Sequence, residues 1–297
     1  MLYIKSLIMR ILFFAFSIVL IFLTSCDRGV APNPPVNSYN DFVARFVYVG
    51  QADATLITTP NGKTFLFDAA TASGAEDYLI PLLDSLRINH IDVAIASHMH
   101  SDHIGGFDDV FEAVPLTGFC YDHGGEYHTD AYDDYITAVA DRRRTISIGD
   151  TLNIGEVEIV CFASGAEGMT PIGENEKSVA IIISYKGFDL FLGGDLTGID
   201  NANQIDVESH IAPNLPQVEL YQSDHHSSRY CNNETILAAL RPLHSVISCG
   251  IDNMYGFPTP EAVARMSVWS DIYRTDLSGT ITVSVIDSSD YVISTQH

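Results

Sequence analysis

A short run of metal-binding side chains constrains this chain more than any other feature. Residues 98–103 read His-Met-His-Ser-Asp-His, and they follow the apolar run 91–97, which predicts a buried strand. Imidazole nitrogens and carboxylate oxygens are ligands for zinc, manganese and iron. Burying three histidines and an aspartate without partners would be costly. The run therefore predicts a metal site where a strand ends, rather than a polar loop rich in histidine.

The charge of the chain limits the class of substrate. The 297 residues include 38 Asp and Glu against 15 Lys and Arg, for a net charge of −23. An acidic surface repels polyanions at long range, so binding to long nucleic acid would need a local basic track. Residues 142–144, Arg-Arg-Arg, are the candidate, and a solvated helix end is the favoured interpretation of them. A small substrate fits the charge better.

The first forty residues are predicted to lie outside the folded domain. Lys5 and Arg10 precede an apolar run, 11–23, which is short for a membrane span. The following Leu-Thr-Ser-Cys resembles a bacterial lipobox, which implies a signal peptide over 1–25 and a lipid on Cys26. Residues 26–40 are then a proline-containing tether, and 41–297 the domain. The protein is expected to lie outside the cytoplasm, anchored to a membrane. A plain signal peptide or an uncleaved anchor is the alternative.

Four further cysteines, Cys120, Cys161, Cys231 and Cys249, are scattered along the chain without a CxxC pair. A cysteine metal cage is therefore not expected. Outside the cytoplasm one disulfide is possible. Buried free thiols are the alternative, and spacing alone does not select between them.

Strand and helix patterns alternate in two halves of the domain. Residues 75–87 have helical spacing, and a second helix is expected to follow residues 123–135 and to run to about residue 144. In the second half, apolar runs at 188–192 and 218–222 predict strands. Two strand-rich halves with helices between them predict an α/β fold with four layers, an αββα sandwich.

Two further polar groups follow predicted strands. Asp195 comes after 188–192 and a pair of glycines, where an aspartate alone is usually a turn former. His225 and His226 come after 218–222, where a surface pair or a helix cap is the simpler interpretation. Taken alone, neither group identifies a site.

The pattern His-x-His-x-Asp-His resembles the metal motif of the metallo-β-lactamase superfamily. That resemblance implies an αββα sandwich and two divalent metal ions, zinc or manganese. The implied ligands are His98 and His100 for the first ion, Asp102 and His103 for the second, Asp195 bridging both, and one histidine of the 225–226 pair. His226 is favoured as that ligand, and His225 then lies close to the substrate.

Three flanking segments resemble the ComEC/Rec2-like competence proteins within that superfamily. They are Val-Gly-Gln-Ala-Asp-Ala at 49–54, Asp-His-His-Ser-Ser at 224–228 and Asn-Met-Tyr-Gly-Phe-Pro at 253–258. Phe257 stands where that branch has histidine. No histidine lies between His128 and Asp195, and Asn175 occupies the related region. The first ion is then expected to be the weaker one and, being richer in oxygen ligands, to prefer manganese.

The chemistry implied by the resemblance is hydrolysis by a metal-bridging hydroxide, with a phosphodiester as the expected substrate. Asp102 is expected to orient the nucleophile or take its proton, and His225 to contact the developing oxyanion. Asp68 and Asn175 are expected to hold the ligands in place, and His123 and His128 to be surface histidines. The alternatives are hydrolysis of another ester, lactone or amide, or a non-catalytic lipoprotein for DNA uptake or binding.

Overall fold

Strands from both halves of the chain form two sheets in the computed structural model, which describes residues 41–297. Within that range the first sheet has the order β15 (Asp290–Thr295), β14 (Ile281–Asp287), β1 (Phe42–Phe46), β2 (Thr55–Thr58), β3 (Thr64–Phe67), β4 (Val93–Ile95), β5 (Cys120–Asp122) and β6 (Arg143–Thr145). The second has the order β13 (Asp271–Arg274), β12 (His244–Ile247), β11 (Leu220–Gln222), β10 (Phe188–Leu192), β9 (Ala180–Tyr185), β8 (Val157–Ala163) and β7 (Thr151–Ile154).

Each sheet changes from antiparallel to parallel pairing along its width. Strands β1, β2 and β3 pair antiparallel, whereas β3, β4, β5 and β6 pair parallel. In the second sheet β8, β9 and β10 are antiparallel, and β10, β11, β12 and β13 are parallel. Parallel neighbours share the edge where their carboxyl ends emerge, so the loops that leave these strands meet there.

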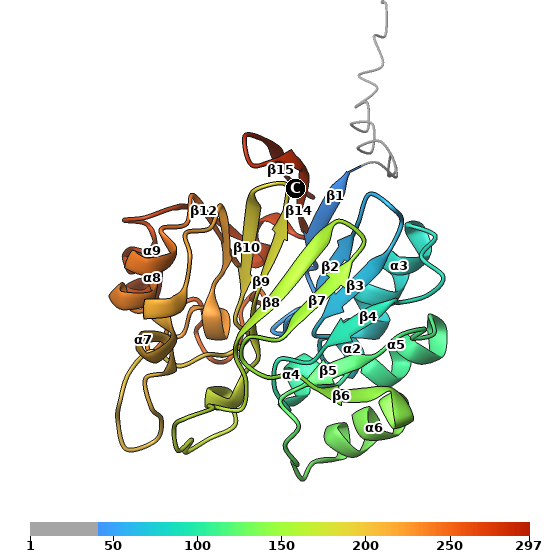
Figure 1. Ribbon diagram of the computed structural model, residues 1–297, viewed down its shortest axis with the longest axis horizontal. Helices are drawn as coiled ribbons and strands as arrows, with labels where there is room; N and C mark the ends of the chain where they lie inside the picture. The colour runs from blue at the N-terminus through green and yellow to red at the C-terminus, as the bar shows by residue number, and fades with distance from the viewer. Residues whose placement is uncertain (1–40) are drawn as a thin grey trace, which may run out of the picture. The chain divides into compact units, whose positions relative to one another are not determined.

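Helices cover the outer face of each sheet (Figure 1). On the first sheet they are α2 (Ala72–Gly74), the π-helical turn η1 (Ala75–Leu79), α3 (Ile80–Ser85), α4 (Ser101–Ile104), α5 (Phe107–Ala113), α6 (Asp130–Val139) and η2 (Ala140–Arg142). In the second half they are η3 (Asn175–Lys177), α7 (Val207–Ile211), η4 (Ala212–Asn214), η5 (Asp224–Ser227), α8 (Glu234–Leu240), α9 (Pro260–Met266) and α10 (Thr275–Ser278). The predicted αββα sandwich is confirmed.

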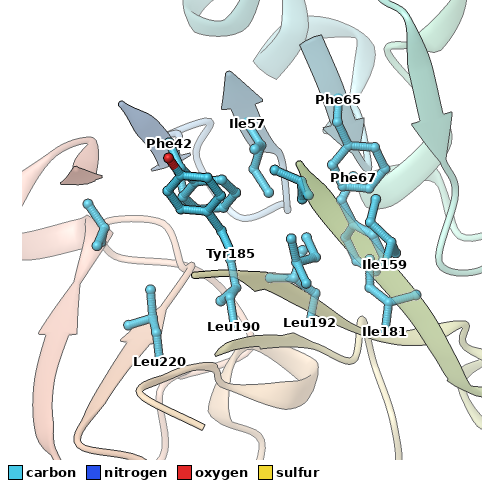
Figure 2. Close-up of a cluster of buried hydrophobic side chains, with 14 of the residues drawn as sticks. Phe42, Ile57, Phe65, Phe67, Ile159, Ile181, Tyr185, Leu190, Leu192 and Leu220 are labelled. Carbon is cyan, nitrogen blue, oxygen red and sulfur yellow. The ribbon is translucent and has the colours of Figure 1, made fainter. Parts of the chain in front are cut away.

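The main core lies between the two sheets (Figure 2). Phe42 and Phe67 of the first sheet and Tyr185 and Leu192 of the second are buried there, and the rings of Phe42 and Tyr185 stack 5.5 Å apart. Burying a side chain of this size contributes about 1.5–3 kcal/mol. Two further apolar clusters fill the spaces between each sheet and its helices, which completes the four layers.

The helix expected to reach residue 144 ends earlier. Helix α6 ends at Val139, and Ala140 has the positive φ of 43°. Arg143 belongs to β6, where its Nε donates to the buried Asp122 carboxylate at 2.6 Å. The guanidinium of Arg144 lies 4.0 Å from the centre of the Phe119 ring. The interpretation as a solvated helix end is therefore wrong for Arg143, because a buried carboxylate requires a partner. Arg142 and Arg144 are exposed, and Arg142 ends the turn η2.

All four cysteines within residues 41–297 are buried free thiols. The predicted signal peptide, the lipidation at Cys26 and the tether over 26–40 fall outside the described residues. No helix in the described part of the chain combines the length and the hydropathy needed to cross a membrane.

Candidate metal centre

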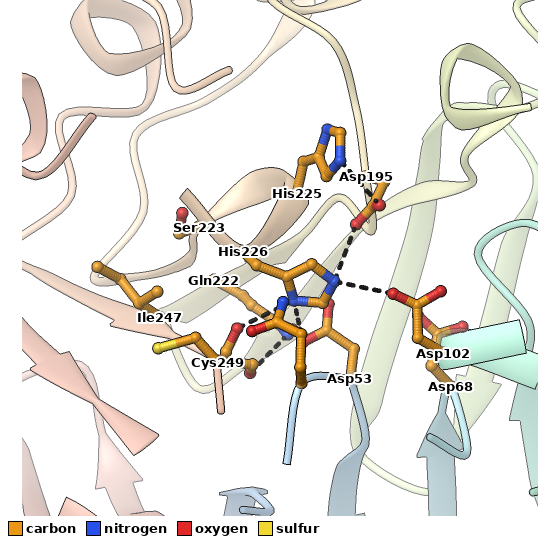
Figure 3. A network of polar contacts seen from close by, with 12 residues as sticks. Asp53, Asp68, Asp102, Asp195, Gln222, Ser223, His225, His226, Ile247 and Cys249 are labelled. Atoms are coloured by element: carbon orange, nitrogen blue, oxygen red, sulfur yellow. Dashed lines mark hydrogen bonds and ion pairs between the residues drawn. The ribbon is translucent and has the colours of Figure 1, made fainter. Parts of the chain in front are cut away.

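The ends of strands from both sheets deliver polar side chains to one edge of the sandwich (Figure 3). From the first sheet come Asp53 in the β1–β2 loop, Asp68 after β3, and His98, His100, Asp102 and His103 after β4. From the second sheet come Asn175 after β8, Asp195 after β10, and His225 and His226 after β11. The structure thus brings every predicted ligand to the same edge, although Asp102 belongs to neither of the two groups of ligand atoms described below, and its role as a ligand stays a prediction.

Within the described residues, one group of ligand atoms lies entirely inside the protein. We call Asp53, His103, Asp195 and His226 the inner cluster, because all four residues are buried and their ligand atoms lie within 4.8 Å of one another. The Asp195 Oδ1 atom is 3.2 Å from His103 Nε2 and 3.7 Å from His226 Nε2. Bonds of about 2.0–2.2 Å to one ion place its ligand atoms roughly 3–4 Å apart, which matches this spacing.

The inner cluster also has unsatisfied polar atoms. Asp53 Oδ1, His103 Nε2, Asp195 Oδ1 and His226 Nε2 are all buried and accept or donate no hydrogen bond within residues 41–297. Buried polar atoms are nearly always paired in native proteins, so four such atoms around one point need an explanation. A divalent cation that binds all four would satisfy them, and the donor set therefore fits a metal ion.

The second group is more open. We call His98, His100 and Asp195 the outer cluster, in which His98 is buried and His100 is half-buried. His98 Nε2 lies 3.0 Å from His100 Nδ1 and 3.8 Å from Asp195 Oδ2. Two ring nitrogens at this distance share either one proton or one cation.

Asp195 is common to both clusters. Its Oδ1 atom faces the inner cluster and its Oδ2 atom faces the outer one, which is the arrangement of a carboxylate that bridges two ions. The two preceding residues must be glycines, because a Cβ on Gly193 would lie 2.1 Å from Asp224 Oδ1 and a Cβ on Gly194 would lie 2.5 Å from the Ser97 Cβ. The glycines therefore let the end of β10 approach the neighbouring loops closely.

Asp68 holds the ring of His103 in place. Its Oδ2 atom lies 2.8 Å from His103 Nδ1 and accepts from the Ser97 hydroxyl at 2.8 Å, and its Oδ1 atom accepts from the backbone N–H of Ser97 at 2.7 Å. With Nδ1 donating to Asp68, the lone pair of Nε2 points into the inner cluster. Asp68 thus lies where it can position a ligand atom, and its role in supporting a metal ligand stays a prediction.

His226 is oriented in the same manner by a backbone carbonyl. Its Nδ1 lies 3.0 Å from the Ser248 oxygen, which leaves Nε2 free to face Asp195. The local backbone is strained, because His225, His226 and Ser227 have φ values of 48°, 50° and 61°. Such left-handed residues cost about 1–3 kcal/mol each and gather at functional sites.

His225 lies beside the clusters and faces the cavity. Its Nε2 atom is 3.6 Å from Asp195 Oδ2, and its side chain is 22% exposed. The Asn175 amide nitrogen lies 3.3 Å from the same His225 nitrogen. Burial lowers the pKa of His225 despite the neighbouring Asp195 carboxylate, so the ring is neutral near pH 7.

Asp102 stands at the border between the inner cluster and the cavity. Its Oδ2 atom is 3.4 Å from His226 Nε2 and 3.9 Å from His103 Nε2, and its side chain is 30% exposed. Burial raises the pKa of the Asp102 carboxyl, but the charges of His103 and His226 outweigh burial and hold that pKa below its usual value. Asp102 is therefore ionised and is accessible to a ligand in the cavity.

The charges of the inner cluster favour a cation. Burial raises the pKa of Asp53 to about 6, although His226 and His103 oppose the change. Burial lowers the pKa of His226, but Asp53 and Asp195 outweigh burial and raise it to about 9. Burial also opposes the charge on His103, but Asp195 and Asp68 raise its pKa well above the usual value. A divalent cation would replace these protons.

The outer cluster differs in protonation. Burial and the neighbouring His103 charge lower the pKa of His98 well below its usual value, and Asp195 only partly offsets them. His98 is therefore neutral and needs to lose no proton before it binds a metal. No histidine from the β8–β9 loop joins this cluster, as the sequence predicted.

Asp53 is a candidate ligand that the sequence prediction missed. It was noted only as part of a motif that resembles a family segment. The segment itself indicates a functional role for Asp53, because Asp53 is the lone charged residue among Val49, Ala52 and Ala54, which are all buried. A carboxylate in such a stretch would be destabilising without a partner.

The prediction that His123 is a surface histidine is wrong. Its side chain is 1% exposed, and Nε2 lies 2.9 Å from Glu174 Oε1. The same Glu174 oxygen accepts from the backbone N–H of Met99 at 3.2 Å, so this pair supports the loop between His98 and His100. His128 is exposed, as predicted.

A cavity of about 590 Å³ opens onto both clusters. It is lined by Gln51, His100, Ser101, Asp102, Tyr127, Thr129, Asp130, Ala131, Asn175, Asp195, His225, His226, Tyr255 and Phe257. A volume of this size suits a small ligand.

Comparison with known proteins also identifies a metallo-beta-lactamase fold. The family model described as metallo-beta-lactamase superfamily matches residues 47–250, which is more than half of the chain. The chain is 25% identical over 256 residues to ComE operon protein 3 of Bacillus subtilis and 28% identical over 235 residues to Competence protein ComA of Neisseria gonorrhoeae. Each match covers 78% of this chain, but 32% and 30% of the relatives, so the chain spans about a third of their length.

A solved structure shares the fold. The metallo-beta-lactamase fold protein YhfI of Bacillus subtilis superimposes with a TM-score of 0.55 at 14% identity, covering 82% of this chain and 100% of that one. At this identity the likeness concerns the fold alone.

Proposed function

Because this chain belongs to the metallo-beta-lactamase superfamily, with homologues in the ComEC/Rec2-like branch, we propose that it is a metal-dependent hydrolase of small phosphodiesters. The superfamily match supports a metal-dependent hydrolase in general, and its fold implies divalent metal ions. The choice of phosphodiesters, the two-ion state and the residue roles are our proposal.

One observation carries the proposal: two groups of ligand atoms share Asp195, and the inner group has four buried atoms that make no hydrogen bond within the described residues. Two divalent ions, when bound, make a water acidic and stabilise charge on both the attacking and the leaving oxygen of a displacement. Asp53, His103, Asp195 and His226 would hold one ion, and His98, His100 and Asp195 the other. Oxygen-rich ligation favours manganese, and histidine ligation also accommodates zinc.

Asp102 and His225 have the protonation states that hydrolysis needs. Asp102 is ionised and borders the cavity, so its carboxylate can orient the attacking water and accept its proton. His225 is neutral and carries one N–H, which can donate to a non-bridging oxygen as charge develops there. Asn175 holds the His225 ring for that contact.

The size and charge of the site favour a small diester. The cavity volume of about 590 Å³ fits a small molecule, and the net charge of −23 opposes a long polyanion. Of the arginines that formed the candidate basic track, Arg143 pairs with the buried Asp122, which leaves Arg142 and Arg144 as its exposed members. A single phosphate group between two cations needs no such track.

A panel of substrates tests this proposal. We expect the purified protein to contain two divalent ions by elemental analysis and to hydrolyse bis-p-nitrophenyl phosphate faster than p-nitrophenyl acetate, a lactone or an amide. The double variant His98→Ala/His100→Ala should lower kcat by at least about 10² to 10³. His210→Ala, which removes an exposed histidine of α7, is the matched control. Turnover unchanged in the double variant would rule out the catalytic assignment.

The names of the relatives favour a second candidate, a part in DNA uptake without catalysis. ComA is named as a competence protein, and the chain covers less than a third of it. This alternative predicts that the protein binds single-stranded DNA and does not hydrolyse any ester in the panel. Hydrolysis of the small diester without DNA binding would eliminate it.

We also propose that Cys26 carries a lipid that tethers the domain outside the cytoplasm. The Leu-Thr-Ser-Cys sequence at 23–26 supports this address. Cys26→Ala should release the protein from the membrane fraction of expressing cells, whereas Cys120→Ala should not. Persistent membrane association of Cys26→Ala would point to an uncleaved anchor.

A further inference from the structure

An aromatic wall stands on one side of the cavity. Tyr255 and Phe257 lie in the loop after β12, and their rings stack with centroids 5.7 Å apart and planes 17° apart. We call these two residues the aromatic wall. Both line the cavity, and Tyr255 is 63% exposed. An aromatic ring this exposed, beside a cavity, leaves a flat face free for a ligand.

The wall is continuous with the metal centre. The ring of Phe257 stacks on the ring of His226, with centroids 6.4 Å apart and planes 22° apart, and meets the edge of His225 at 5.7 Å. A planar group on the exposed Tyr255 ring would therefore extend the stack of Tyr255, Phe257 and His226, which ends at a ligand of the inner cluster. The wall lines the same cavity as Asp102, Asp195 and His225, so one arm of a diester whose phosphorus lies between the two clusters would extend along it.

The loop that carries the wall is held at three points. The backbone N–H of Gly250 donates to Gln51 Oε1 at 3.1 Å, and a Cβ at Gly250 would lie 2.6 Å from the Gln51 nitrogen. Asn253 accepts from the Phe257 N–H at 3.0 Å. The Thr259 N–H donates to the Ser227 oxygen at 2.9 Å. Because the loop is ordered before a ligand arrives, binding on the wall costs little conformational entropy.

The lining indicates which arms the cavity accepts. No lysine or arginine lines it in the part of the chain that the structure describes. Tyr127 lines it as well, and its ring lies 5.8 Å from the ring of His100 in the outer cluster. Aromatic side chains thus flank both clusters, and a second charged group on either arm would find no cationic partner. The favoured arm is planar and uncharged.

We propose that the aromatic wall is a specificity subsite that binds a planar aromatic arm of the substrate. This inference rests on the proposed function for the reaction, but it concerns the choice between arms of one diester. Tyr255 and Phe257 contribute stacking, and Phe257 also holds the His226 ring against the inner cluster.

Two diesters with the same leaving group test the subsite. They are p-nitrophenyl phenyl phosphate and p-nitrophenyl cyclohexyl phosphate, whose arms have similar size but differ in planarity. We expect the metal-loaded protein to prefer the phenyl arm about tenfold in kcat/KM. Tyr255→Leu should abolish the preference and Tyr255→Phe should retain it. Tyr230→Leu, which removes a 45% exposed tyrosine that does not line the cavity, should leave it unchanged.

Calorimetric binding of phenylphosphonate and cyclohexylphosphonate separates this inference from the reaction itself. We expect the metal-loaded protein to bind the phenyl compound about tenfold more tightly, and Tyr255→Leu to bind both alike. If binding discriminates but no diester is hydrolysed, the proposed function fails and the subsite stands. If hydrolysis occurs and neither measurement discriminates between the arms, the subsite is refuted and the function stands. Absence of both turnover and binding refutes both.

Discussion

The inner and outer clusters share Asp195 but differ in burial and charge. The inner cluster is buried throughout, and Asp53 and Asp195 raise the pKa of His226 to about 9. The outer cluster includes the half-buried His100, and burial with the neighbouring His103 charge lowers the pKa of His98. His226 must therefore lose a proton before it binds an ion, whereas His98 is already neutral.

This difference teaches that two adjacent ions need not be equivalent. Two carboxylates and two imidazoles surround the inner position, whereas one carboxylate and two imidazoles surround the outer one. We therefore expect the inner ion to be held tightly and to be released slowly. The outer position borders the cavity, so an ion bound there should exchange readily. That the first site is the weaker one stays a prediction.

Removal of the shared carboxylate should have the largest effect. Asp195→Ala deletes a ligand of both clusters, so we expect less than one bound ion per chain and a loss of kcat by more than about 10³. Asp195→Asn keeps the volume and tests whether the charge matters. Elemental analysis and diester turnover measure the result. Retention of both ions by either variant would falsify the bridging role.

Variants that affect one cluster each should separate the two sites. Asp53→Asn should release the inner ion, and His100→Ala should release the outer ion, with a fall in kcat of about 10²- to 10³-fold for each. Elemental analysis and the rate of metal release to a chelator distinguish the two variants. The inner ion that remains in His100→Ala should be released slowly, and the outer ion that remains in Asp53→Asn should be released quickly. If both variants lose the same ion, the division into two clusters is wrong.

Loss of the hydrogen bond between Asp68 and His103 should have a smaller effect on metal binding. Asp68→Asn keeps the shape but replaces a charged acceptor, so the affinity for the inner ion should fall by about 10- to 100-fold while the outer ion is unaffected. Isothermal titration with manganese provides the measurement. Asp84→Asn, on the exposed face of α3, is the control. Equal weakening of both sites would contradict a role confined to His103.

A change of one pH unit should have the smallest effect. The pKa of His226 is raised to about 9, so below that pH a proton occupies the atom that binds the ion. Affinity for the inner ion should therefore rise with pH and fall about tenfold per displaced proton from pH 8 to pH 7. Because the pKa of His98 is lowered, the outer ion should respond less. Titrations in two buffers with different protonation enthalpies count the protons released.

The sequence predicted the fold and most of the centre because those features follow from local patterns. The spacing of the ligands from His98 to His103 predicts a metal site without any further information. The glycines before Asp195 indicate that the backbone there approaches neighbouring loops closely. Asp53 was missed because its role depends on His226, which lies on the other sheet. No local pattern reports such a contact.

Errors at Arg143 and His123 have the same origin. Polar residues in a stretch without apolar periodicity were interpreted as solvated, yet Asp122 and Glu174, both buried, recruit Arg143 and His123 as partners. The carboxylate that requires a partner lies at least twenty residues away in each case, apart from any periodic pattern. The need of a buried charge for a partner can be stated from sequence, but the identity of that partner cannot.

The position of the inner cluster at the seam between the two sheets has a consequence for unfolding. Asp53 belongs to the first sheet and His226 to the second, so one ion joins segments that are far apart in the chain. An ion that binds only the native state stabilises it by mass action, by about 4 kcal/mol at a thousand times its Kd. The denaturant midpoint should therefore follow the free concentration of the ion, and a chelator should make the two halves of the sandwich separate more easily.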